Sequence, residues 1–303
     1  MFRPASRFTT SLLAVAFWLA GFGSSAIAAP ASPPNFSPNP SARWFSYSRV
    51  YIPPSSGPGP VRPHPQHRLV SNDEFRATGA QTTFPMGDPD SPILLPWARD
   101  ALRTHNALIL SGKPAFSPTA SCWPAGVTYF LLRPMTLPLY FVQAPDKVLL
   151  ISAGFNDVRR IHLNAPHSPS LKPSWYGESV GHYEGDTLVV DTIGLNGRTF
   201  IDNFRTPHTE QLHVVERFRL TDGGETLEVN VYVEDPGAFT APWRAIQRFR
   251  RFEELVARSA VGTLAVLATP DEGPLIEMVC AENPYSLMGM EAFPLPQTTI
   301  PDF

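Results

Sequence analysis

Two neighbouring segments of this chain alternate between apolar and polar side chains at every second position. In residues 211–220 and 226–235 the apolar positions are Leu212, Val214, Phe218, Leu220, Leu227, Val229, Val231 and Val233. A period of two is the signature of strands with one buried face. The intervening residues 221–225, Thr-Asp-Gly-Gly-Glu, are typical of a hairpin turn. The pair therefore predicts an antiparallel sheet whose core face can be identified residue by residue.

Further short apolar or β-branched segments, separated by turn residues, extend this sheet. They predict strands at 127–132, 139–143, 147–152, 158–164 and 187–193, and closing strands at 261–268 and 275–280. Residues 245–258 fit a helix and a strand equally. Pro96 predicts the start of a helix that runs to about residue 108. We expect a mainly β fold with one or two peripheral helices, an antiparallel meander that forms a lipocalin-like barrel or a sandwich. We favour the barrel, which has room for one small ligand.

The ends of the chain differ in composition from its middle. Arg3 and Arg7 precede an apolar run at 12–22, and small residues follow at 26–28, so residues 1–28 predict a signal peptide. A buried N-terminal helix is the alternative. The apolar run is too short to span a bilayer, and no later run approaches the necessary length. We therefore expect a periplasmic or secreted protein with no membrane partner after cleavage.

Proline content divides the remainder of the chain. Residues 29–94 are rich in proline, which donates no backbone hydrogen bond, and they predict an extended arm. Residues 95–285 form the expected β-rich domain, and residues 286–303 an irregular tail. The formal net charge of −3 argues against a nucleic-acid partner. The sequence does not predict the oligomeric state.

The chain has two cysteines, Cys122 and Cys280. In an oxidising compartment an even pair predicts a disulfide. A catalytic thiol is the alternative, whereas two thiolates alone do not complete a tetrahedral metal site.

Glu216 is the anomaly of the predicted core face, because it shares that face with Val214 and Phe218. A carboxylate among apolar side chains is costly unless it is paired or protonated. One interpretation is a proton-transfer group at the bottom of a ligand cavity. The other is a salt bridge to an inward arginine, such as Arg159 or Arg160. A Glu216→Gln variant that folds but loses activity would support the first, and a failure to fold the second.

His208 and His213 precede Glu216 in the same segment and, together with His182, are its candidate partners in acid–base catalysis. A metal site is disfavoured, because His213 and Glu216 are three residues apart and point to opposite faces of a regular strand. The spacing also matches no established zinc motif. The sequence contains no phosphate loop and no dinucleotide fingerprint, so we expect no cofactor.

Residues 174–186 gather aromatic, acidic and glycine residues around a predicted turn. Trp175, Tyr176 and His182 are candidates to line a barrel mouth and stack on a planar ligand, and an ordinary hairpin is the alternative. Trp243 and Asp235 are further candidate ligand contacts. Residues 177–181 fit the letter of the Gly-x-Ser-x-Gly hydrolase motif around Ser179, but no helix follows, which disfavours a serine hydrolase.

Several of these segments together resemble a family of uncharacterised exported bacterial proteins. The resemblance rests on residues 122–126, 174–192, 207–218, Asp235-Pro236 with Pro242-Trp243, and 280–283, and it covers roughly residues 95–285. The pattern includes a cysteine near each end of the region, which fits a bridge between Cys122 and Cys280. It attaches no activity and carries over no catalytic residue.

Two functions remain open from the sequence. The first is an exported enzyme of the lyase, isomerase or hydrolase type, which uses Glu216 and a histidine on a small molecule inside the barrel. The second is a non-catalytic barrel in which the same groups orient a ligand. A second titratable side chain beside Glu216, in a pocket open to solvent, would favour the enzyme.

Overall fold

The computed structural model describes residues 32–38, 42–46, 48–70, 85–113, 123–132, 138–152 and 157–251, with isolated positions between them. The signal-like residues 1–28, both cysteines and the expected strands at 261–268 and 275–280 lie outside the described residues. The signal peptide, the disulfide and the closing strands therefore stay predictions.

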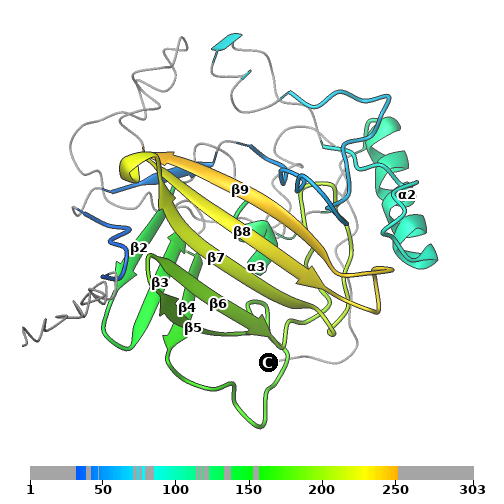
Figure 1. Cartoon of the computed structure of the whole chain (residues 1–303). Coiled ribbons are helices and arrows are strands. Elements are labelled where there is room, and N and C mark those ends of the chain that lie inside the picture. The colour runs from blue at the N-terminus through cyan, green and yellow to red at the C-terminus, as the bar shows by residue number, and fades with distance from the viewer. Residues whose placement is uncertain are drawn as a thin grey trace, which may run out of the picture. The chain divides into compact units, whose positions relative to one another are not determined.

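The described strands form a closed barrel in which each strand is hydrogen-bonded to the next along the chain (Figure 1). Its members are β1 (Trp44–Ser46), β2 (Leu139–Gln143), β3 (Lys147–Ser152), β4 (Asp157–Leu163), β5 (Glu178–Glu184), β6 (Thr187–Ile193), β7 (His213–Thr221), β8 (Thr226–Glu234) and β9 (Trp243–Arg251). The barrel closes where β9 pairs with β1. The expected β-barrel is confirmed.

The hairpin that most clearly predicts sheet lies where the sequence places it. β7 and β8 pair in antiparallel register, with Glu216 opposite Val231 and Phe218 opposite Val229. A short 3-10 helix, η2 (Asp222–Gly224), makes the turn. Val214, Glu216 and Phe218 are fully buried, whereas Val215 and Arg217 between them are partly exposed, so the predicted inward face is confirmed.

Three features of the barrel differ from the expectation. β4 and β5 are parallel, with Ile161 opposite Ser179, so the barrel is a mixed sheet and not a pure antiparallel meander. The Pro-rich arm supplies β1, and the barrel therefore begins within residues 29–94. The ambiguous segment 245–258 is strand through Arg251, the last residue described.

The prediction of a strand at residues 127–132 is wrong. Residues Val127–Phe130 form a short helix, α3, and Leu131 and Leu132 follow in a turn. Nearly the whole segment is buried, and a continuous apolar run suits a buried helix as well as a buried strand. Its carbonyls are used by inward side chains: Leu131 O accepts from Gln247 Nε2 at 3.1 Å, and Thr128 O from the Tyr51 hydroxyl at 2.7 Å. Thus α3 fills space against the inner face of the barrel, behind β7 and β8 in Figure 1.

Helix α2 (Pro96–Leu110) begins at Pro96, as expected. It buries Ala98, Leu102 and Asn106, which are four residues apart and share one face of the helix. Asn106 Nδ2 donates to Gly87 O at 2.8 Å, and the chain entering the helix is held by Leu95 N–H to Ala238 O at 2.9 Å. Within the described residues, no helix has the length and apolar character needed to cross a membrane.

Candidate functional site

Glu216 is held by a guanidinium inside the barrel. Arg159, on β4, donates to both Glu216 carboxylate oxygens, one of them at 2.8 Å. The same guanidinium donates to Ser179 Oγ at 3.2 Å and to Thr192 Oγ1 at 2.9 Å. Both charged side chains are at most 1% exposed. This geometry is the salt bridge to an inward arginine that the sequence offers as the structural interpretation of Glu216.

Ser179 and Tyr51 complete the neighbourhood of this ion pair without supplying a free proton donor or acceptor for chemistry. Ser179 lies on β5, and its hydroxyl is shared between Arg159 and Thr192, so it is not placed on a nucleophile elbow. The Tyr51 hydroxyl donates to Thr128 O. Burial raises the pKa of Tyr51 well above its ordinary value, and the negative charge of Glu216 raises it further. Tyr51 therefore remains a neutral hydrogen-bond donor.

The three candidate histidines are not brought together with Glu216. His213 faces outward on β7, where its Nε2 lies 3.1 Å from Asp191 Oδ2. His182 is exposed on β5 and contacts Glu184 Oε1 at 3.0 Å. His208 is buried, 2.8 Å from Thr199 Oγ1, and burial lowers its pKa. Its Nδ1 lies 2.9 Å from Thr209 O, so Nδ1 donates there and Nε2 accepts from the Thr199 hydroxyl.

Asp235 and Trp243, two of the candidate ligand contacts, are also buried. The Asp235 carboxylate accepts from Thr209 N–H at 2.6 Å, from Thr209 Oγ1 at 2.7 Å and from Gly237 N–H at 2.9 Å, so it fixes the turn after β8. The Trp243 ring packs edge-on against Tyr51 and Phe239. Both residues thus pack within the protein.

His208 ends a buried polar loop, residues 199–208, that sequence reasoning missed. Every residue of the loop except the partly exposed Phe200 is buried. The Asp202 carboxylate accepts from the backbone of Phe204 at 2.9 Å and from the backbone and hydroxyl of Thr206 at 3.2 and 2.9 Å. Burial outweighs these neutral donors and raises the pKa of Asp202 to about 6. The Asp-x-x-x-Thr spacing of a side-chain-capped turn is the signal that could have revealed the loop.

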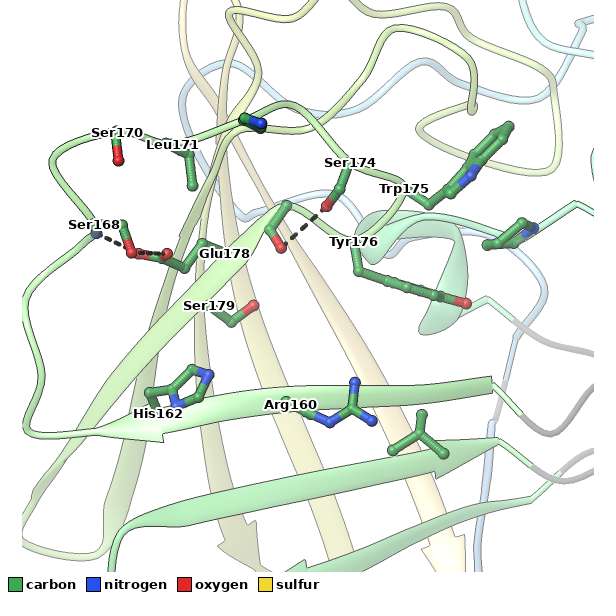
Figure 2. Close-up of a pocket in the computed structure, with 14 residues that line it drawn as sticks. Arg160, His162, Ser168, Ser170, Leu171, Ser174, Trp175, Tyr176, Glu178 and Ser179 are labelled. Carbon is green, nitrogen blue, oxygen red and sulfur yellow. Dashed lines mark hydrogen bonds between the residues drawn. The ribbon is translucent and has the colours of Figure 1, made fainter. Parts of the chain in front are cut away.

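The aromatic candidates Trp175 and Tyr176 line a pocket of about 540 Å³ on the outside of the barrel (Figure 2). One wall is the outer face of β4, which presents Arg160 and His162. The opposite wall is the chain between β4 and β5, residues 164–177, which we call the crossover segment. The full lining is Pro124, Val158, Arg160, His162, Ser168, Ser170, Leu171, Lys172, Ser174, Trp175, Tyr176, Gly177, Glu178 and Ser179.

The pocket exists because β4 and β5 are parallel. Parallel neighbours cannot be joined by a tight hairpin, so the crossover segment must return along the sheet before β5 begins. Prolines at 166, 169 and 173 exclude a helix from this return. The segment is instead held to the loop after β6: Ser174 N–H donates to Gly194 O at 2.9 Å, and Leu171 packs where a side chain at Gly194 would stand.

The beginning of the crossover segment is fastened by polar contacts to β5 and β6. Ser168 donates to the Glu178 carboxylate from its backbone N–H at 2.6 Å and from its hydroxyl at 2.5 Å. His167 lies between two carboxylates, with Nδ1 3.2 Å from Glu178 Oε1 and Nε2 3.0 Å from Asp191 Oδ1. These hydrogen bonds, first those from Ser168, hold the pKa of Glu178 below its ordinary value.

The pocket carries excess positive charge. Arg160, His162 and Lys172 are exposed, and within the described part of the chain their side chains make no hydrogen bond or ion pair. The carboxylate among the lining residues, Glu178, is already engaged by Ser168 and His167. Aromatic and basic side chains thus line the same hollow, and Figure 2 shows the Tyr176 ring above Arg160.

The sequence predicts the aromatic residues of this pocket but not its basic ones. Arg160 is a candidate partner for Glu216 in the sequence, and neither His162 nor Lys172 is a candidate there. Strand parity is the signal that separates them: Arg159, Ile161 and Leu163 are buried, so Arg160 and His162 must face outward together.

A second pocket, of about 590 Å³, lies among prolines of residues 53–60, the chain before α2 and the chain before β9. Its charged lining residue is Arg62, and it contains none of the candidate site residues. Among the described residues, no group of three or more histidine, cysteine, aspartate or glutamate side chains is placed to hold a metal ion.

Comparison with known proteins adds no relative. No protein-family model matches the chain, and no curated protein matches it.

Proposed function

We propose that this β-barrel protein binds a small anionic molecule with a planar ring in the pocket between β4 and the crossover segment. One observation carries the proposal: the pocket is lined both by Arg160 and Lys172, which have no partner among the described residues, and by the aromatic side chains of Trp175 and Tyr176. On the expectation of a signal peptide, the proposal is that this binding occurs in the periplasm or outside the cell.

The chemistry of the lining fits such a ligand. A guanidinium binds carboxylate, sulfonate or phosphate oxygens through two parallel hydrogen bonds, and no described residue occupies the donors of Arg160. Trp175 and Tyr176 offer flat, apolar faces on which a ring can stack. A volume of about 540 Å³ falls within the range of pockets that hold small organic ligands.

The geometry favours binding over the acid–base enzyme that the sequence also suggests. Catalysis through Glu216 requires a second titratable group beside it and access for a substrate. The neighbours of Glu216 are instead Arg159, Ser179 and Thr192, and the carboxylate is fully buried. The aromatic and cationic side chains that suit a ligand lie on the other face of the sheet.

The test compares two fluorescent probes of similar shape, anilinonaphthalene sulfonate, which is anionic, and N-phenylnaphthylamine, which is neutral. We expect the purified protein to bind the anion and Arg160→Gln to weaken that binding about tenfold, since a charge-assisted hydrogen bond contributes about 1.5–3 kcal/mol. Tyr176→Leu should weaken the binding of both probes.

Arg219→Gln is the matched control. Arg219 is also an exposed strand arginine, but it pairs with Asp186 in the turn between β5 and β6 and lies outside the pocket. It should bind both probes as the unmodified protein does. Equal affinity of Arg160→Gln and the unmodified protein for the anionic probe would remove the proposal.

A further inference from the structure

The side chain of His167 has two carboxylates as neighbours, one on each ring nitrogen. Its Nδ1 lies 3.2 Å from Glu178 Oε1 on β5, and its Nε2 lies 3.0 Å from Asp191 Oδ1 on β6. A neutral imidazole has one N–H and one bare nitrogen, so it can satisfy only one of two carboxylates. Both contacts are hydrogen bonds only when the ring carries a proton on each nitrogen. The geometry is therefore that of an imidazolium.

The position of His167 links this proton to the pocket. His167 and Ser168 open the stretch of the crossover segment that continues through Ser170, Leu171 and Lys172, which line the pocket. The Glu178 carboxylate, which contacts the His167 ring and accepts a hydrogen bond from Ser168, also lines the pocket. The His167 contacts therefore lie at the start of the wall that faces Arg160.

We propose that His167, bridging Glu178 and Asp191, is a proton-operated latch that holds the crossover segment against the barrel and makes ligand binding in this pocket strongest when the imidazole is protonated. We call this set of three residues the His167 bridge. The ligand-binding part of the inference rests on the proposed function, whereas the closure of the segment does not.

Charged groups from neighbouring strands surround the bridge. Glu178 from β5 and Asp191 from β6 face His167 directly, with side chains 21% and 40% exposed. His213 from β7 contacts the other oxygen of Asp191, and Glu234 from β8 lies 3.9 Å from His213 Nδ1. Tyr232 from β8 donates to Glu234, and Arg244 from β9 lies over the Tyr232 ring. Negative groups thus outnumber positive ones next to His167.

The charge state of the two carboxylate partners sets how the bridge responds to the imidazole proton. The hydrogen bond to His213 is the main cause that lowers the pKa of Asp191, and the hydrogen bonds from Ser168 lower that of Glu178. Both carboxylates therefore stay charged in mildly acidic solution. The bridge is therefore complete when the imidazole is protonated and broken when it is neutral.

When His167 loses its proton, one of its two carboxylate contacts becomes unfavourable. Glu178 keeps its two hydrogen bonds from Ser168, and Asp191 keeps His213. The barrel strands thus keep their partners, and the effect is confined to how tightly the crossover segment is held beside Ser168.

The latch is tested first without any ligand, by hydrogen exchange of the peptide covering residues 164–177 in the full chain. At about pH 5.5 the unmodified protein should exchange about tenfold more slowly than His167→Gln, because one charge-assisted hydrogen bond is lost in the variant. At about pH 8 the two proteins should exchange alike. Comparing proteins at the same pH cancels the intrinsic pH dependence of exchange.

His182→Gln is the control for this measurement, since His182 is an exposed histidine on β5 that pairs with Glu184 away from the pocket lining. It should exchange as the unmodified protein does at both pH values. Equal exchange of His167→Gln and the unmodified protein at about pH 5.5 would overturn the latch, whatever the probes do.

The second arm measures the affinity for anilinonaphthalene sulfonate at the same two pH values. The unmodified protein should bind about tenfold more weakly at about pH 8, His167→Gln should bind weakly at both, and His162→Gln should keep the pH dependence. If the pH dependence of probe binding disappears in His162→Gln and persists in His167→Gln, it is caused by His162 in the pocket, and the inference is overturned. Slow exchange without probe binding would refute the proposed function and leave the latch standing.

Discussion

Arg159 and Arg160 are consecutive residues of β4 with opposite surroundings. Arg159 points into the barrel, is 1% exposed, and has its guanidinium occupied by Glu216, Ser179 and Thr192. Arg160 points outward into the pocket and has no side-chain partner among the described residues. The same side chain one position apart thus stabilises the core in one case and is available to a ligand in the other. On β4 the inward arginine is thus occupied by the core, whereas the outward one is free among the described residues.

The largest expected difference between the two arginines is in stability. Arg159→Met should lower the free energy of unfolding by about 3–5 kcal/mol, because it leaves the Glu216 charge buried without its partner. Arg160→Met, the neighbouring control, should change it by less than about 0.5 kcal/mol. Urea denaturation of both variants makes the measurement. Equal losses from the two would mean that the inner ion pair does not hold the core.

Adding Glu216→Leu to Arg159→Met extends the same comparison. Because removing both charges leaves no buried ion, the double variant should recover a large part of the lost stability. A double variant less stable than Arg159→Met alone would show that Glu216 supports the barrel through contacts other than Arg159.

Asp202 is a second buried carboxylate and extends the comparison of buried charges. Its hydrogen-bond donors are neutral, whereas the donor to Glu216 is a guanidinium. The pKa of Asp202 is raised to about 6, so between about pH 4 and 6 the folded protein binds more protons than the unfolded chain. Stability contributed at this site is therefore present at low pH and lost as pH rises, by about 3 kcal/mol in total.

The variant Asp202→Asn isolates this effect, because other titrating groups contribute equally to both proteins. The stability of the unmodified protein relative to Asp202→Asn, from urea denaturation, should fall by about 3 kcal/mol between about pH 4 and 7. A constant difference over this range would contradict the raised pKa.

The smallest expected effect concerns the outer wall of the pocket. Gly194 has φ +71° and no room for a side chain beside Leu171, whereas Gly223 has a similar φ of +69° and open space around it. Gly194→Ala should therefore cost about 1–2 kcal/mol more than Gly223→Ala, because both substitutions share the backbone strain and only the first displaces Leu171. Denaturation midpoints of the two variants measure the difference.

Binding provides the second measurement on the same pair. Gly194→Ala should weaken the binding of the anionic probe and Gly223→Ala should not, because Leu171 lines the pocket and η2 does not. A Gly194→Ala variant with normal affinity would show that the crossover segment is not needed as a wall.

The parts of the fold that the sequence predicts are those where alternation fixes a face. The hairpin of β7 and β8, the inward position of Glu216 and its pairing with an inward arginine all follow from a period of two. The helix at Val127–Phe130 does not follow, because an uninterrupted apolar run has no period. The parallel pairing of β4 with β5 does not follow either, because it depends on the path of the crossover segment and not on the pattern within a strand.

The candidate site was less predictable than the barrel for a related reason. Trp175 and Tyr176 stand out in composition, whereas Arg160, His162 and Lys172 look like ordinary solvated side chains until the crossover segment is placed over them. Glu216 attracted attention because a buried charge is rare, and it is buried because it is paired. An unusual residue in the sequence, Glu216, thus turned out to belong to a structural ion pair. The unpaired basic residues of the pocket can be recognised only in the folded structure.

The short strand β1 has a consequence for the order in which the barrel assembles. It is inserted between β2 and β9, and its Trp44 pairs with Arg251 at the far end of the described chain. Hairpins such as β7–β8 require only local loop closure, whereas this pairing requires nearly the whole described chain to be in place. We therefore expect the N-terminal strand to dock last. Until it does, β2 and β9 are open edges, and the nearly closed sheet is the species most exposed to pairing with another chain.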